Sequence, residues 1–276
     1  MMFKSFLFTF LVLFSVSSFA GIENQFKKNE MDELRDGVGI DEKLGDKIDL
    51  NLKFKNEQGE EVSLGSYFQS GKPVMLALVY FNCPSLCNFQ LNGIVETLKK
   101  LEWTTGNEFE FVIASIEPTE TPDLAKSKKE SYMTVYDRKE GAKGWHFLTG
   151  SQESITALAD QVGFRYKWVE SRNEYAHTAA TYVLTPEGKI SRYLYGIGFT
   201  PKTLRLSLVE ASNNKIGNAV DRFLLYCFRY DPEKRGYAFY AFNIMRAGAA
   251  VSVVALLAFL VPFWIRQRKQ RLKENS

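Results

Sequence analysis

Two cysteines with three residues between them are the part of this chain best suited to chemistry. Cys83 and Cys87 follow an apolar run from Val74 to Tyr80, which predicts a buried strand, and they precede apolar residues at helical spacing. Pro84 suits the first helical position, because its missing N–H would have no partner there. Free backbone N–H groups and the helix dipole at that end favour thiolate over thiol. Such a pair can form a disulfide or bind one soft metal ion, and the spacing alone leaves both open.

One of the chain's two histidines could complete a metal site, although the residues alone equally allow an ordinary loop histidine, which is the simpler interpretation. His177 comes shortly before a predicted strand from Thr181 to Leu184, in a loop that we expect beside the cysteine-bearing end of the helix. Two thiolates and one imidazole suit Cu(I), a soft ion that accepts few ligands. A structural zinc site would normally have a fourth protein ligand. The other histidine, His146, follows Trp145 and is interpreted as a packed or surface residue rather than a ligand.

The first twenty residues have the pattern of an export signal. Lys4 precedes an apolar run from Phe6 to Phe14, and small residues close the segment at Ser18 and Ala20. These features predict a signal peptide over residues 1–20, cleaved after Ala20.

A second apolar segment lies near the other end of the chain. Arg246 and Arg266 bracket 19 uncharged residues, enough for a helix to span the hydrocarbon core of a bilayer. A basic tail follows at once, so the positive-inside rule predicts a cytoplasmic C-terminus. The chain is therefore expected in the bacterial inner membrane, crossing it once, with its main domain in the periplasm.

Charge and cysteine content restrict the class of protein. The formal net charge is +3, and the basic tail together with Lys4 accounts for the excess, so the exported part is near neutral. We therefore expect no nucleic-acid partner. The chain has only 3 cysteines, too few for a disulfide scaffold, so a hydrophobic core must stabilise the domain. The third, Cys227, lies in an apolar segment and is interpreted as a small buried hydrophobe, with an accessory thiol near the membrane as its functional alternative.

Hydrophobic periodicity divides the chain into a leader, one domain and a membrane anchor. The predicted strands are residues 49–54, 62–64, 74–80, 109–116, 164–169, 181–184 and 190–194, and the predicted helices are 84–103, 123–136, 153–162 and 201–210. Strands that alternate with helices and then end in a hairpin and a last helix predict an α/β fold with a mixed central sheet. With the cysteines at the first major strand–helix junction, the arrangement is thioredoxin-like. The expected segments are a signal peptide (1–20), a leader (21–44), the thioredoxin-like copper-binding domain (45–212), a juxtamembrane segment (213–245), one transmembrane helix (246–266) and a basic cytoplasmic tail (267–276).

The chain resembles the Sco/SenC copper chaperones. Two stretches carry the resemblance: Tyr80-Phe81-Asn82-Cys83-Pro84-Ser85-Leu86-Cys87, and His177 with the later run from Tyr182 to Ile190. The resemblance runs from about Gly45 to Ser212. It implies that Cys83, Cys87 and His177 are copper ligands. It also implies copper delivery to the binuclear copper site of cytochrome c oxidase, or reduction of the thiols there. The implied partner is the copper-bearing subunit of that oxidase or another periplasmic cuproprotein.

Two departures mark a divergent branch of that family. The family usually has Asp before the histidine, where this chain has Ala176, so a partner for the imidazole is missing from the expected place. The family's usual membrane anchor is N-terminal, whereas here a signal peptide and a C-terminal span replace it.

Two classes of function follow from these residues. The first is a metallochaperone, which is not an enzyme. The second is a membrane-tethered thiol–disulfide oxidoreductase that uses the Cys83/Cys87 pair as nucleophile and partner. His177 separates the two classes, because copper binding needs the imidazole and disulfide exchange does not. A plain structural disulfide is disfavoured, because a bridge that closes so short a loop removes little entropy from the unfolded chain.

Overall fold

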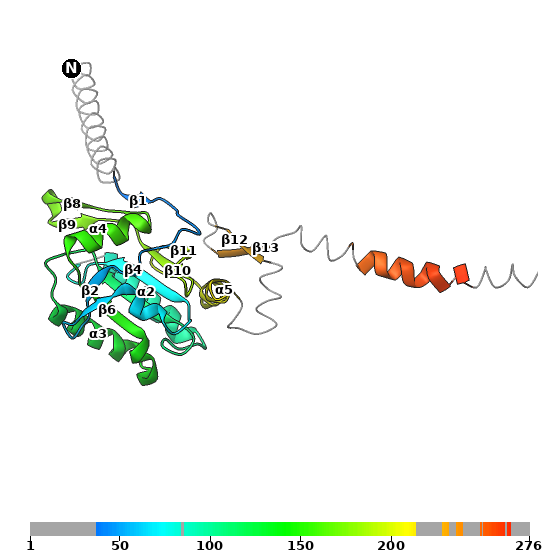
Figure 1. Cartoon of the computed structure of the whole chain (residues 1–276), viewed down its shortest axis with the longest axis horizontal. Coiled ribbons are helices and arrows are strands. Elements are labelled where there is room, and N and C mark those ends of the chain that lie inside the picture. The colour runs from blue at the N-terminus through cyan, green and yellow to red at the C-terminus, as the bar shows by residue number, and fades with distance from the viewer. Residues whose placement is uncertain are drawn as a thin grey trace, which may run out of the picture.

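The computed structural model of the chain describes residues 37–83, 86–213, 228–231, 236–239, 249, 251–262 and 264–265. A five-stranded sheet forms the centre of the domain, in the order β11-β10-β4-β5-β6 (Figure 1). Its strands are β4 (Val74–Val79), β5 (Glu110–Ser115), β6 (Trp145–Leu148), β10 (Ala180–Leu184) and β11 (Ile190–Tyr195). The first three are parallel, whereas β10 is antiparallel to β4 and β11 is antiparallel to β10. The sheet is therefore mixed, as predicted.

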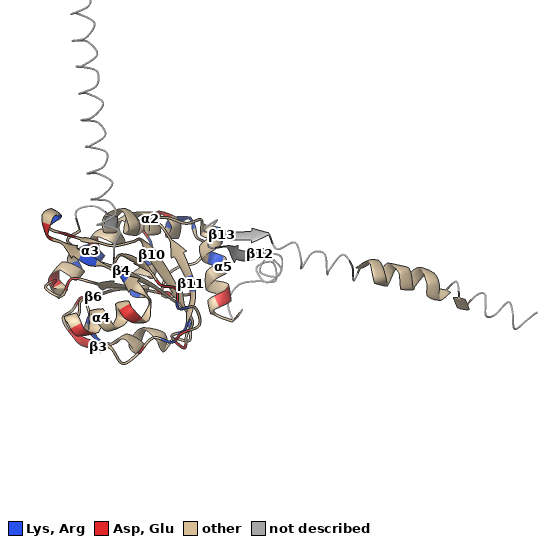
Figure 2. Cartoon of the chain, turned by 90° about the horizontal axis from the view of Figure 1, so that it is seen from above, with Lys and Arg blue, Asp and Glu red and all other residues tan. Residues whose placement is uncertain are grey.

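Four helices flank this sheet. They are α2 (Leu86–Lys100), α3 (Pro122–Tyr136), α4 (Gln152–Gln161) and α5 (Pro201–Ala211). Helix α2 contacts both α3 and α5, and these three lie on one side of the sheet, while α4 and β3 lie on the other (Figure 2). Every residue of β4 and β5 is buried, because both faces of these central strands are covered.

Side chains at the helix N-termini explain where three of the helices begin. The hydroxyls of Thr121, Ser151 and Thr200 accept hydrogen bonds from the backbone N–H groups three residues further on. Pro122 and Pro201 then occupy first-turn positions, where a missing N–H costs nothing.

Four two-stranded sheets and three short helical turns complete the described elements up to Phe239. The pairs are β1 (Gly39–Ile40) with β7 (Phe164–Arg165), β2 (Lys53–Lys55) with β3 (Glu61–Ser63), β8 (Lys167–Val169) with β9 (Glu174–Ala176), and β12 (Phe228–Asp231) with β13 (Gly236–Phe239). The 3₁₀ turns are η1 (Leu64–Phe68), η2 (Lys139–Gly144) and η3 (Glu170–Arg172).

Two predicted strands differ from the structure. The strand predicted over residues 49–54 begins only at Lys53, because Asp49 accepts a hydrogen bond from the Asn51 N–H and closes a turn. The strand predicted over 164–169 divides at Tyr166, so that β7 pairs with β1 and β8 pairs with β9. The partner strand β1 lies within the predicted leader, residues 21–44.

The predicted membrane segments lie partly or wholly outside the described residues. Residues 251–262 are helical, and their large apolar side chains are exposed. Within the described ranges, no helix has the length and apolar character needed to cross a bilayer. Of the predicted span (246–266), residues 246–248, 250, 263 and 266 lie outside the described residues, as do the signal peptide (1–20), the tail (267–276) and Cys227.

Candidate metal centre

Three residues from three separate elements meet in one buried cluster. Cys83 lies in the turn after β4, Cys87 lies in the first turn of α2, and His177 directly follows β9. One ligand atom from each, the two sulfurs and an imidazole nitrogen, all lie within 4.8 Å of one another. The three residues are 4%, 1% and 8% exposed. The structure therefore brings together all three residues that the sequence analysis assigned to a metal site.

Strand pairing explains why His177 reaches the cysteines. Strand β10 runs antiparallel beside β4, with Thr181 opposite Ala77. The start of β10 therefore lies at the same edge of the sheet as the end of β4. His177 is four residues before Thr181, and Cys83 is six residues after Ala77, so both loops emerge at that edge.

Short-range hydrogen bonds fix the position of Cys83. Its sulfur accepts from the Cys87 backbone N–H at 3.4 Å, in the first turn of α2. Its carbonyl oxygen accepts from the Asn88 side-chain amide at 2.7 Å, and its own N–H donates to the Tyr80 carbonyl at 3.3 Å. The sulfur is therefore directed at the helix N-terminus, where a negative charge is favoured.

The two thiols have very different proton affinities. A hydrogen bond from the Cys87 thiol, helped by hydrogen bonds from His177, the Tyr80 hydroxyl and the Cys87 N–H, lowers the pKa of Cys83 to about 3, although burial opposes the shift. Burial, together with the proton that it shares with Cys83, raises the pKa of Cys87 above its ordinary value. The metal-free reduced pair therefore holds one proton at neutral pH, with the negative charge on Cys83.

The imidazole of His177 is oriented by a backbone carbonyl. Its Nδ1 lies 3.0 Å from the Thr178 carbonyl oxygen, which can only accept, so Nδ1 carries a proton. The other ring nitrogen, Nε2, lies 3.1 Å from the Cys87 sulfur and is the nitrogen available to a metal ion. The carbonyl takes the role that a preceding carboxylate would fill, so Ala176 does not leave the ring without a partner.

Glu120 holds the loop in front of Cys83. One carboxylate oxygen accepts from the Phe81 N–H at 2.8 Å and from the Ser115 hydroxyl at 2.6 Å, and the other accepts from the Asn82 N–H at 2.7 Å. Burial raises the pKa of this carboxyl, although these three hydrogen bonds oppose the shift. Sequence reasoning assigned no role to the loop from Glu117 to Asp123, and its acidic residues were the only available signal.

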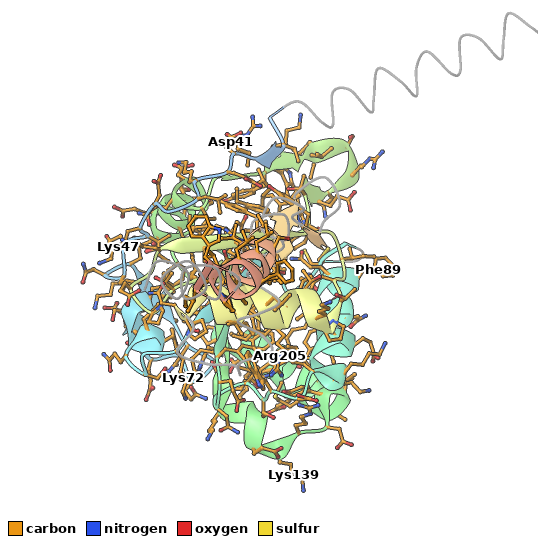
Figure 3. The ribbon with its side chains drawn as sticks, turned by 90° about the vertical axis from the view of Figure 1, so that its right-hand side faces the viewer. Asp41, Lys47, Lys72, Phe89, Lys139 and Arg205 are labelled. Carbon is orange, nitrogen blue, oxygen red and sulfur yellow. The ribbon has the colours of Figure 1, made fainter. Side chains whose placement is uncertain are left out.

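Tyrosines form the wall of the cluster, which sequence reasoning also missed. The Tyr80 hydroxyl is hydrogen-bonded to Cys83, and its ring lies edge-on to His177 with 6.3 Å between ring centroids. Tyr175, next to Ala176, lies edge-on to Tyr80 at 5.4 Å. In contrast, Phe89 on α2 points away from the domain and is 59% exposed (Figure 3).

His146 lies outside the cluster. It is on β6, where its Nε2 is 3.0 Å from Glu110 and its ring lies 4.3 Å from that of Tyr67. It is therefore a packed residue, in agreement with its interpretation from sequence.

The fold and the cluster define a class: a thioredoxin-like protein with a buried dithiol–imidazole site. The family model described as SCO1/SenC matches residues 41–209, and the chain belongs to this family. A SCO1 protein homolog from Bacillus subtilis (strain 168) is 26% identical over 164 residues, which cover 58% of this chain and 80% of that protein.

Solved structures agree in fold. A proposed electron transfer protein from Aquifex aeolicus VF5 superposes with a TM-score of 0.54 at 23% identity, over 63% of this chain and 96% of that one. A proposed electron transport protein from the same organism gives a TM-score of 0.50 at 22% identity, over 61% of this chain and 98% of that one. At this level of identity the likeness shows the fold alone.

Proposed function

We propose that this protein binds Cu(I) through Cys83, Cys87 and His177 and delivers it as a copper chaperone. The observation that carries the proposal is the convergence of two sulfurs and one imidazole nitrogen within 4.8 Å in a buried site. Sulfur and imidazole ligands in so small a set suit Cu(I). Among the described residues, no fourth ligand completes the set that structural zinc would need.

The chain's own groups prepare the site for its cargo. Cys83 is already a thiolate at neutral pH, so only the proton of Cys87 must leave when the ion binds. The Nε2 atom of His177 faces the sulfurs because Nδ1 is held by the Thr178 carbonyl. Oxidation of both thiols to a disulfide would remove the sulfur ligands, which couples copper loading to the redox state of the pair.

The recipient that we propose is the copper-bearing subunit of cytochrome c oxidase or another periplasmic cuproprotein. Membership of the SCO1/SenC family supports this assignment. We also propose a membrane anchor at the C-terminal end, which would keep the domain near a membrane-bound recipient. The exposed apolar helix at residues 251–262 and the basic residues that follow it support the anchor.

A thiol–disulfide oxidoreductase is the second candidate. It is favoured by the unequal thiols, since a low-pKa Cys83 beside a protonated Cys87 is a suitable attacking thiolate. Their burial counts against direct attack on a protein disulfide, because access limits such exchange.

Copper titration of the reduced full chain tests the first proposal against the second. We expect one Cu(I) per chain, with the affinity of the His177→Ala variant lower by at least about 10–100-fold. The matched control, His146→Ala, should bind as the wild type does, and both variants should still form the Cys83–Cys87 disulfide. Equal affinity in the wild type and the His177→Ala variant would favour the oxidoreductase.

A further inference from the structure

A row of oxidisable aromatic rings connects the buried site to the surface. Trp168 on β8 is 42% exposed, and its ring lies 5.0 Å from that of Tyr175 on β9. Tyr175 lies 5.4 Å from Tyr80, which lies 6.3 Å from His177. All three contacts are edge-to-face, within the range of centroid distances usual for aromatic pairs. The β8–β9 hairpin that carries the outer two rings lies at the edge of the domain (Figure 1).

Each polar ring in this row has a partner for its proton. The Trp168 indole N–H donates to Glu170 at 2.7 Å, and the Tyr175 hydroxyl donates to Glu117 at 3.0 Å. Tyrosine loses an electron readily only when its proton has somewhere to go, so a hydrogen-bonded carboxylate is what a tyrosine relay requires. Burial acts against the charge on Glu117, but the Thr119 hydrogen bonds outweigh it and lower the pKa of this carboxyl. Glu117 is therefore a carboxylate at neutral pH and can accept the proton.

The burial of the centre makes such a path useful. Cys83, Cys87 and His177 are all less than 9% exposed, so an external redox agent cannot touch them. We propose that Trp168, Tyr175 and Tyr80 relay single electrons between the buried centre and a one-electron oxidant that reaches the β8–β9 hairpin. This function is additional to copper delivery, and its copper-loaded form rests on the proposed function above.

The transfer balances in both states of the centre. The oxidant takes one electron from Trp168, which takes one from Tyr175 as the phenolic proton moves to Glu117. Tyr175 recovers its proton from Glu117 and its electron from Tyr80. The Tyr80 proton moves toward its hydrogen-bond partner Cys83 and returns when the centre supplies the last electron, so bound Cu(I) would become Cu(II). In the metal-free chain two such transfers oxidise the thiol and thiolate to a disulfide and release one proton. The rings end unchanged in either case.

A second row of rings offers a matched control. Tyr166 also contacts Tyr175, at 5.6 Å, but it continues to Phe164, which lies 5.9 Å from His177. A phenylalanine has no exchangeable proton and is much harder to oxidise, so the proposed relay does not use this second row. Tyr166→Phe therefore removes one hydroxyl beside Tyr175 without breaking the proposed relay.

Flash photolysis with a ruthenium tris-bipyridine photosensitiser and a sacrificial electron acceptor tests the relay. The full chain is used in detergent, with Trp264→Phe as background, because Trp264 is 71% exposed. In the copper-loaded protein we expect Tyr175→Phe and Trp168→Phe to slow the appearance of Cu(II), measured by electron paramagnetic resonance, by at least about tenfold. Tyr166→Phe and Trp103→Phe should match the background.

A copper-independent measurement separates this proposal from copper binding. In the metal-free reduced chain, the yield of the Cys83–Cys87 disulfide per flash should fall in the same two variants and in no control. That result would support the relay even if the chain bound no copper. Equal rates and yields in all variants would overturn it. Slower transfer together with a lower Cu(I) affinity and altered thiol alkylation would also overturn it, because Tyr175 would then be a structural residue.

Discussion

At the scale of single residues, Cys83 and Cys87 have the same chemistry in solution but different states in the fold. Cys83 lies at the N-terminal end of α2 with hydrogen bonds to its sulfur, whereas Cys87 is 1% exposed and depends on its neighbour's charge. The Cys87 thiol stabilises a negative charge on Cys83 by donating to its sulfur. That charge then opposes the ionisation of Cys87. The pair is therefore prepared to bind a cation without being doubly charged beforehand.

This asymmetry predicts the pH behaviour of the metal-free reduced chain. The pKa of Cys83 falls from about 9 to about 3 because Cys87 donates to its sulfur. Since the unfolded chain then binds more protons than the folded one between these values, the free energy of unfolding should rise with pH across this window. Thiolate absorbance should persist from about pH 8 to about pH 5 in the wild type and titrate near the ordinary thiol range in Cys87→Ala. A wild-type transition in the ordinary range would contradict the assignment.

Glu120 should be a positioning residue for the cysteine loop. Both of its oxygens accept, from Phe81, Asn82 and Ser115. In Glu120→Gln one oxygen becomes an NH₂ group, which cannot accept and faces a donor. We expect a loss of about 1–3 kcal/mol in the free energy of unfolding by urea denaturation, with weaker Cu(I) binding. Glu96→Gln, which changes an exposed helix ion pair, is the control and should leave both unchanged. A stable Glu120→Gln chain with unchanged affinity would exclude this role.

Residue types and spacing predicted the cluster but not its surroundings. The rarity of cysteine and histidine in the chain reduces the choice of soft ligands to very few residues. Glutamate and tyrosine are common residue types by comparison, and the chain has 13 tyrosines, so nothing in the sequence singles out Glu120 or Tyr175. Their roles arise from contacts such as Glu120 with Asn82, 38 residues apart, which no local pattern encodes.

At the scale of elements, the helices and strands that could be predicted are those with a clear hydrophobic pattern or a clear start signal. Strand β4 is a six-residue apolar run, β5 has an apolar centre from Phe111 to Ala114, and the capped helices carry clear start signals, so all were expected close to their observed bounds. Strands β6 and β9 were missed, because each is short and takes its shape from a neighbouring strand. Trp145 and Phe147 on β6 complete the core only after β5 lies beside them.

The contact between α2 and the loop before α5 depends on one glycine. A Cβ at Gly93 would lie 1.7 Å from the Ile197 carbonyl oxygen, so this loop must move in Gly93→Ala. In a helix interior, alanine is normally more favourable than glycine by about 1 kcal/mol. Here we expect a net loss of about 1–3 kcal/mol in the free energy of unfolding, measured by denaturant titration. In Gly198→Ala, where a Cβ meets nothing within 4 Å, stability should stay within about 0.5 kcal/mol of the wild type. Equal stability of the two variants would show that the loop yields without cost.

At the scale of the whole molecule, the topology determines what reaches the site. The antiparallel insertion of β10 beside β4 brings a residue 90 positions away to Cys87. In the view of Figure 2, acidic and basic residues are interspersed over the domain, with no large region of a single charge. A chaperone with such a surface would depend on being held near its recipient. This is the physical reason for proposing an anchor.

The two ends of the chain predict its orientation in the membrane. We expect export directed by residues 1–20, cleavage after Ala20, one span at 246–266 and a cytoplasmic C-terminus, because five basic residues follow Trp264 and Ile265 at once. Alkaline phosphatase, which is active only in the periplasm, should be silent when fused after Ser276. The same reporter fused after Ser212, at the end of the α/β domain, should be active and is the matched control. Activity of both fusions would place the tail outside and refute the orientation, whereas silence of both would refute export of the domain. Changing the five tail lysines and arginines to glutamine should raise activity at Ser276, because the charge that retains the tail is then gone.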